Sequence, residues 1–196
     1  MKKFAVITTL SLITLTGCTK KNDIENTQAI SEPQIIDTAS NLNSDERRKL
    51  ALLLTMTLSQ MGQLSEAKKV EEEYSKIKDP TTADKFLIEK YTTAKSELEQ
   101  LALTGDYQAQ RNIAYAYATD PEKFGRNHIQ ACGWYLVVLS SGSPKVDAGD
   151  KSNVEVYCSH KFLNDSERSQ AFAFGKETYG KIYKDTNKFD SFYGTI

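Results

Sequence analysis

The sequence predicts an all-α domain of about six helices between residues 43 and 184. Apolar residues recur there at spacings of three and four positions, which places them on one face of a helix. Turn-forming residues such as Gly62, Pro80 and Gly105 divide this pattern into segments of helical length. No stretch alternates polar and apolar residues over a useful length, so no strand is predicted.

Three helices are predicted in the first half of this region. Asn43 caps the first helix, and Glu46 is positioned to complete a capping box. Gly62 ends that helix, Pro80 stops the second, and the third runs from Thr81 to Gly105. The three apolar stripes are Leu50, Leu53, Leu54, Leu58 and Met61; Leu64, Ala67, Val70, Tyr74 and Ile77; and Leu87, Tyr91, Ala94, Leu98 and Leu101.

Three more helices are predicted in the second half. Residues 140–149 form a loop, residues 153–162 carry weak helix signals, and Asn164 with Glu167 gives the last helix a capping-box start. Residues 185–196 are predicted to be a polar C-terminal tail, whose aromatic residues either cap the core or stay exposed for a partner. These aromatic residues are Phe189, Phe192 and Tyr193. The apolar stripes are Ala109, Ile113, Ala116 and Tyr117; Ala131, Trp134, Tyr135, Val138 and Leu139; and Phe172, Gly175, Tyr179 and Ile182.

The N-terminus has the composition of an export signal. Residues 1–3 are Met-Lys-Lys, and an apolar run of about twelve residues follows, against the roughly twenty that a membrane-spanning helix needs. Residues 1–17 are therefore predicted to be a signal peptide. The sequence at its end, Leu15-Thr16-Gly17-Cys18, resembles the lipobox of bacterial lipoproteins. The alternative is an ordinary signal peptide with an unrelated cysteine.

The lipobox resemblance implies that the chain is cut before Cys18 and that lipid on this cysteine anchors it to a membrane. Thr19 stands where an aspartate would resemble the inner-membrane retention signal, so the resemblance implies the outer membrane, with the protein on its periplasmic face. Residues 18–42 are mostly polar and show no sustained apolar period. They are predicted to be the lipidated cysteine and a flexible tether to the helical domain, which spans residues 43–184.

Residues 105–142 contain a recognisable repeat pattern. It consists of Gly105, Asp106, Ala109, Gln110, Ile113, Tyr117, Ala131, Trp134, Tyr135 and Gly142. This pattern resembles a Sel1-like repeat, a helix–turn–helix unit related to tetratricopeptide repeats, although Tyr107 replaces a preferred alanine and Ala114 a usual glycine. Residues 50–80 resemble a tetratricopeptide unit more weakly. The resemblance implies helical hairpins in a short solenoid or bundle that binds other proteins.

Two cysteines remain besides Cys18, and their chemistry has alternatives. In an oxidising compartment the pair Cys132 and Cys158 favours a disulfide. The alternative is a zinc site formed by both cysteines with His128 and His160, although the Cys-x-His spacing is poor for chelation. The sequence contains no His-Glu-x-x-His motif, phosphate-binding loop or Gly-x-Ser-x-Gly turn, so neither enzymatic activity nor a cofactor is predicted.

The sequence therefore favours a non-enzymatic lipoprotein that binds another protein. Loss of the two signal-peptide lysines leaves 23 basic against 26 acidic residues, a net charge near −3 that argues against nucleic acid as a partner. Tyr115, which points away from the apolar stripe of its helix, and Tyr107 are the predicted partner contacts. Lipoproteins with Sel1-like repeats, which this chain resembles, act as immunity proteins against antibacterial effectors, and this role is the leading hypothesis. A pilotin-like role in envelope assembly and a zinc-binding role are the alternatives.

Overall fold

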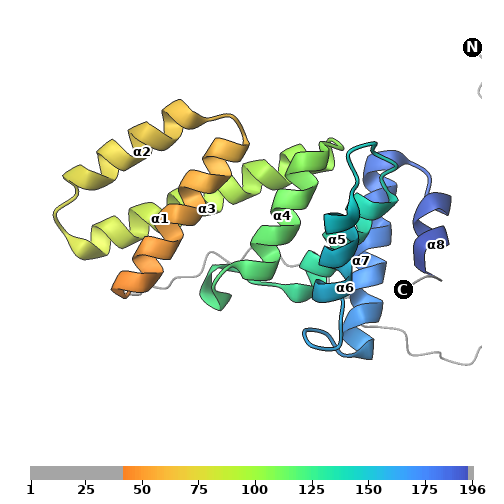
Figure 1. The fold of residues 1–196 in the computed structure, drawn as a ribbon. Coiled ribbons are helices and arrows are strands. Elements are labelled where there is room, and N and C mark those ends of the chain that lie inside the picture. The colour runs from red at the N-terminus through yellow and green to blue at the C-terminus, as the bar shows by residue number, and fades with distance from the viewer. Residues whose placement is uncertain (1–41, 194–196) are drawn as a thin grey trace, which may run out of the picture. The chain divides into compact units, whose positions relative to one another are not determined.

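The computed structural model describes residues 42–193, and these residues contain eight α-helices, a short 3-10 turn and no strand (Figure 1). The helices are α1 (Ser44–Gln60), α2 (Leu64–Lys76), α3 (Pro80–Leu103), α4 (Tyr107–Thr119), α5 (His128–Ser140), α6 (Ala148–Tyr157), α7 (Asp165–Tyr183) and α8 (Asn187–Tyr193). The predicted all-α class is confirmed, but the count of six is wrong because α6 and α8 were not recognised as helices. The predicted signal peptide, Cys18 and nearly all of the tether lie outside the described residues.

Side-chain caps set most helix starts. The predicted capping boxes at Asn43 and Asn164 are both present. A third capping box, which was not predicted, pairs Asp147 with Asp150. Because this box satisfies the first backbone N–H groups of α6, the helix begins at Ala148, inside the segment that was predicted to be a loop.

Two groups of buried apolar side chains make up the core, and α3 belongs to both. Leu87, Tyr91 and Ala94 pack with α1 and α2, whereas Leu98 and Ala102 pack with the helices that follow. With 24 residues, α3 is about 36 Å long, long enough to serve both groups. Figure 1 shows α3 running from beneath α1 and α2 towards α4. Its single apolar stripe therefore connects the two halves of the fold.

Helix α5 lies at the centre of the second half and is almost wholly buried. Every residue from Ala131 to Val138 is buried, and α5 packs against α4, α6, α7 and α8. An apolar composition around the whole helix, rather than one stripe, accounts for this position. Two glycines allow the close approach of α5 and α7. A Cβ atom added to Gly133 would lie 2.8 Å from the carbonyl oxygen of Ala171, and one added to Gly175 would lie 2.9 Å from that of Gly133.

Both ends of the predicted domain extend further than the sequence indicated. Leu42, predicted to be part of the tether, is buried, and its backbone N–H donates to Asp84 Oδ2 at 2.8 Å. The predicted polar tail forms α8, whose Phe189 is 1% exposed and packs against Phe172 and Tyr179. Phe189 is therefore a core residue. The side chains of the other two tail aromatics are outside the described set.

The described residues all belong to one compact unit, so a chain that starts at Thr19 retains the whole of it. Within the described residues, no helix combines the length and apolarity that crossing a membrane requires.

Candidate functional site

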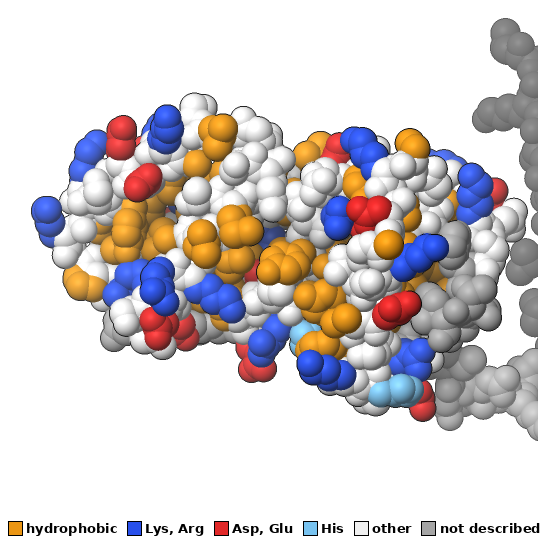
Figure 2. All heavy atoms as spheres, in the orientation of Figure 1, with side chains coloured by type: hydrophobic (Ala, Val, Ile, Leu, Met, Phe, Trp, Pro, Cys, Tyr) orange, Lys and Arg blue, Asp and Glu red, His pale blue; other side chains and the backbone are white. Residues whose placement is uncertain are grey.

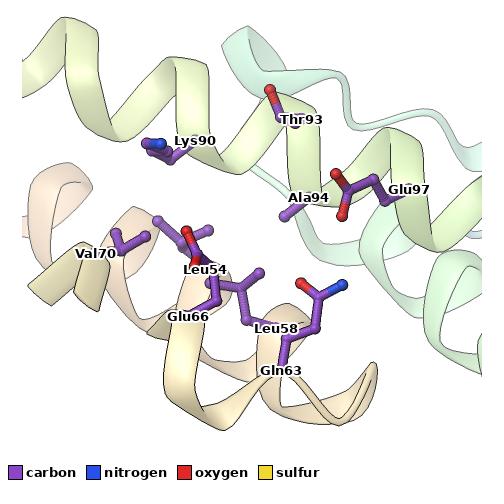
Figure 3. A pocket seen from close by; sticks show the side chains of 9 residues that line it. All are labelled: Leu54, Leu58, Gln63, Glu66, Val70, Lys90, Thr93, Ala94 and Glu97. Carbon is purple, nitrogen blue, oxygen red and sulfur yellow. The ribbon is translucent and has the colours of Figure 1, made fainter. Parts of the chain in front are cut away.

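A groove between α1, α2 and α3 is the strongest candidate site. It has a volume of about 390 Å³. Its floor is apolar and its rim is polar (Figure 3). The floor consists of Leu54, Leu58, Val70 and Ala94, and the rim consists of Gln63, Glu66, Lys90, Thr93 and Glu97. We call this feature the α1–α3 groove.

This groove lies between α2 and α3, which are packed less closely against each other than against α1. Helix α1 packs against both of them, whereas α2 and α3 contact each other much less than α1 and α3 do. At one end the rings of Tyr74 and Phe86 stack with centroids 6.5 Å apart and join the two helices. At the other end the chain turns at Gly62, whose φ of +76° is a left-handed conformation that suits glycine. The groove therefore lies between the Tyr74–Phe86 contact and this turn, where Gln63 contributes to its lining.

Two residues predicted to be core lie exposed instead. Leu64, at the start of α2, is 59% exposed, and Leu101 of α3 is 39% exposed. Leu101 follows Glu97 by one helical turn, so it continues the face of α3 that lines the groove. Both residues lie on helices as predicted, but the described part of the chain covers their side chains only in part.

Charged side chains line the rim of the groove. Glu66 reaches the groove from α2, and Lys90 and Glu97 reach it from α3; in the view of Figure 3 the Glu66 carboxylate lies nearer Lys90 than Glu97. Lys90 Nζ is 5.5 Å from the centre of the Phe86 ring. Within the described residues Glu97 forms no ion pair, and the Glu66 carboxylate is 3.6 Å from the Lys69 ammonium, with both side chains well exposed. The rim of the groove therefore carries charges of both signs.

Tyr107 is not available as a partner contact, which corrects the sequence-based prediction. It is 8% exposed, and its hydroxyl donates to Asp150 Oδ2 at 2.7 Å. Arg111 Nε lies 2.9 Å from the other oxygen of this buried carboxylate. Burial, together with the hydrogen bond to Asp150, raises the pKa of Tyr107 to about 12. Tyr107 therefore fastens α4 to the start of α6.

Tyr115, the other predicted partner contact, is exposed. Its side chain is 46% accessible on α4, while Leu52 and Met56 are exposed one turn apart on α1. Helices α1 and α4 touch each other, and Figure 2 shows hydrophobic side chains over both on the face in view. None of these three exposed residues lines the α1–α3 groove, so they belong to a different part of the surface.

A buried polar cluster, which the sequence did not reveal, fixes the chain after α4. The carboxylate of Asp120 accepts a hydrogen bond from Tyr91 Oη at 2.6 Å and lies 2.6 Å from Lys95 Nζ. Lys95 Nζ is also 4.3 Å from the centre of the Tyr117 ring, and Tyr117 Oη donates to Glu99 at 3.2 Å. Burial raises the pKa of Asp120, and the nearby lysine opposes this shift. No local pattern pairs residues that are 29 positions apart, as Tyr91 and Asp120 are.

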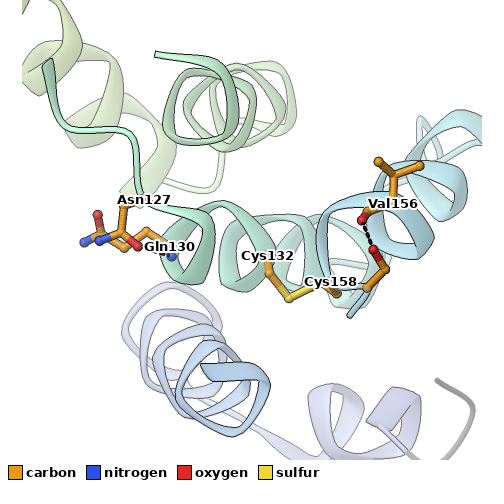
Figure 4. Close-up of a disulfide and its surroundings, with 6 residues drawn as sticks. Asn127, Gln130, Cys132, Val156 and Cys158 are labelled. Carbon is orange, nitrogen blue, oxygen red and sulfur yellow. Dashed lines mark hydrogen bonds between the residues drawn. A yellow bond between two sulfur atoms is a disulfide. The ribbon is translucent and has the colours of Figure 1, made fainter. Parts of the chain in front are cut away.

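Cys132 and Cys158 form a disulfide in the structure, 26 positions apart in the sequence (Figure 4). It joins the middle of α5 to the residue that ends α6. Neither sulfur is then a thiolate, so the alternative zinc site is not formed. The histidines have other contacts. The ring of His128 packs 4.8 Å from that of Phe162, and His160 Nε2 lies 3.0 Å from Arg168 Nη1. Burial lowers the pKa of His128.

A second pocket of about 410 Å³ lies beside this disulfide. It is lined by Cys132, Leu136, Cys158, Asp165, Arg168, Ser169 and Phe172. Among the described residues no group of three or more His, Cys, Asp or Glu side chains is arranged to hold a metal ion.

Comparison of the chain with models of protein families, with curated proteins and with solved structures finds no significant match.

Proposed function

We propose that this chain is a non-enzymatic, lipid-anchored protein-binding module of the bacterial envelope, and that it neutralises an antibacterial effector delivered to the periplasm. The observation that supports binding most directly is the α1–α3 groove. Its floor of Leu54, Leu58, Val70 and Ala94 is apolar, and packing within the chain already leaves these side chains only 2–5% exposed. A partner that filled the groove would make van der Waals contact with this floor, and most of the apolar area that it buried would belong to exposed residues around the groove.

Two exposed leucines stand close in the sequence to lining residues: Leu64 follows Gln63, and Leu101 follows Glu97 by one helical turn. Complete burial of one leucine side chain contributes roughly 1.5–3 kcal/mol. Leu64 is 59% exposed and Leu101 is 39% exposed, so a partner that covered them would gain about half of that amount from each. Exposed apolar residues beside a polar-rimmed groove are typical of protein interaction sites.

The α4–α5 helix pair supports the Sel1-like part of the proposal. Ala109 and Ala131 are buried between the helices, where small side chains permit close packing, and Trp134 and Tyr135 are each 1% exposed. These are the residue types that the resemblance assigns to a helical hairpin of a short solenoid. Such hairpins present surfaces to partner proteins.

The lipobox resemblance supports the location. Lipid on Cys18 would hold the domain at the periplasmic face of the outer membrane, where a delivered effector arrives. Covering the active site of that effector would protect the cell. The sequence between the anchor and Leu42 supplies about two dozen residues of reach.

The test is a pull-down with the chain from Thr19 to Ile196 as bait, on envelope extract and on secreted proteins, with partners identified by mass spectrometry. A single tight partner, toxic when exported to the periplasm and harmless when this chain is co-expressed, would establish the immunity role. Recovery of a secretin or another envelope-assembly subunit would replace it with the assembly role. Recovery of neither class would refute the proposed function.

A further inference from the structure

We infer that the buried polar cluster between α3 and α4 is a proton-binding site: Glu99 takes up a proton as the surroundings become more acidic, and this uptake stabilises the packing of α3 against α4 and α5. The inference goes beyond the proposed function, because it concerns how the domain responds to pH and requires no partner. We call this feature the α3–α4 cluster. It consists of Tyr91, Lys95, Glu99, Tyr117 and Asp120, together with the indole group of Trp134.

The cluster contains two carboxylates but only one ammonium group. Asp120 is fully buried and lies 2.6 Å from Lys95 Nζ, so these two charges balance each other. Among the described residues Glu99 forms no ion pair, and its carboxylate accepts a hydrogen bond from Tyr117 Oη at 3.2 Å. With both carboxylates ionised the cluster has a net negative charge where little water reaches it. Such a charge is costly, and one proton removes it.

The surroundings of Glu99 favour its neutral form. Helix α4 packs against both α3 and α5, so Glu99 lies among side chains of three helices (Figure 1). Burial there raises the pKa of Glu99, and this effect exceeds the opposing effects of Tyr117, Lys95 and Trp134. Lys49 of α1 also acts on the cluster, but it does so at Asp120, where it favours the ionised form.

The indole N–H of Trp134 is a second observation that indicates a proton on Glu99. Trp134 is 1% exposed, and its Nε1 is buried without a well-formed hydrogen bond in the described part of the chain. It is nevertheless close enough to Glu99 to affect that carboxyl group. A neutral Glu99 keeps a carbonyl oxygen that can accept from this N–H, and its new O–H can donate to Tyr117 Oη. The protonated form can therefore satisfy both neighbours.

Proton binding at Glu99 is linked to folding. In the unfolded chain Glu99 releases its proton near the ordinary glutamate value of 4.5, whereas the folded chain retains the proton to higher pH. The resulting stabilisation is complete below the unfolded value and is lost as the pH rises through the folded value. Asp79, whose pKa is lowered by its hydrogen bonds to Thr82, has the opposite pH dependence. The contribution of Glu99 must therefore be measured as a difference between variants.

The first measurement is a fluorescence titration of the folded chain from Thr19 to Ile196, in which Trp134 is the single tryptophan. We expect its emission to change in one step with a midpoint above 4.5. Glu99→Gln resembles the neutral acid and should abolish this step. The matched control is Glu97→Gln, which removes one negative charge from an exposed position of the same helix and should retain the step.

The second measurement is urea unfolding at about pH 5 and about pH 8. The unfolding midpoint of the original chain should fall relative to that of Glu99→Gln between the lower and the higher pH, whereas its difference from Glu97→Gln should stay constant. Tyr117→Phe removes a hydrogen bond that favours the carboxylate, so it should move the fluorescence midpoint to higher pH. This variant decides the question if Glu99→Gln does not fold.

Three results would each overturn the inference. They are a fluorescence midpoint at or below 4.5, a step that persists in Glu99→Gln, and an original chain that gains stability over Glu99→Gln as the pH rises. Because none of these measurements involves a partner, their outcome and that of the pull-down are independent.

Discussion

The crossing of α5 and α7 makes a quantitative prediction for Gly175→Ala. In a helix interior, alanine is favoured over glycine by about 1 kcal/mol, so propensity alone would stabilise the variant. The new Cβ atom, however, would lie 2.9 Å from the carbonyl oxygen of Gly133 and 2.8 Å from Cζ of Phe189. Overpacking of this kind costs about 1–3 kcal/mol, and the upper half of that range applies because backbone cannot swing aside as a side chain can. We therefore expect a net loss of about 1–2 kcal/mol in the free energy of unfolding.

The assay is urea unfolding followed by far-UV circular dichroism, with the disulfide intact. Gly180→Ala in the same helix is the matched control, because its Cβ would lie 3.2 Å from a methyl group of Thr186, a side chain that can move. We expect that control to change the free energy of unfolding by less than about 1 kcal/mol. If Gly175→Ala were as stable as the original chain, or more stable, the close α5–α7 contact would be wrong.

Three further predictions concern single contacts. Cys132→Ala/Cys158→Ala should lower the free energy of unfolding by about 3–4 kcal/mol, because the bridge closes a loop of 26 positions; adding reductant to the original chain should lower its melting temperature similarly. Lys95→Met should cost about 3–5 kcal/mol at pH 7, because Asp120 loses its cation while buried. Without that cation the carboxyl pKa rises further, so its protonation makes the deficit measured by urea unfolding smaller at pH 4 than at pH 7; an equal deficit at both would contradict the pairing. Tyr107→Phe should cost about 1 kcal/mol of stability, measured by thermal melting, without changing the affinity for a recovered partner.

The course of the helices could be predicted from local signals. The starts at Asn43 and Asn164 follow from short-range capping, in which a side chain reaches backbone only three positions away. The start of α6 depends on the same capping chemistry. It was not predicted because residues 140–149 are rich in Ser, Gly and Pro, a composition typical of loops, and the capping box of Asp147 and Asp150 was overlooked. The helix α8 is only seven residues long, so its sequence contains little helical periodicity. Its packing depends on the contact of Phe189 with Tyr179 of α7.

Candidate site residues were harder to predict than helices. Tyr107 and Tyr115 are both tyrosines on α4, yet one is buried against Asp150 and the other is exposed. The difference arises because α6 packs beside Tyr107: Asp150, which accepts its hydrogen bond, lies 43 positions further along the chain. The rim carboxylates of the groove gave no sequence signal, because Glu66 and Glu97 are ordinary exposed helix residues until α2 and α3 are placed side by side.

The sequence by itself determined the helical class, most helix boundaries and the residues that form the apolar stripes, since these depend on interactions within a few positions of the chain. Only the tertiary structure decided which part of each stripe is covered. Leu87 and Leu101 are on one predicted stripe of α3, but Leu87 packs with residues of α1 and α2 and is 2% exposed, whereas Leu101 is 39% exposed. The groove between α2 and α3 depends on how both helices pack against α1 and on the Tyr74–Phe86 contact that joins them. Long-range packing of this kind has no local pattern, and so it becomes visible only in the folded chain.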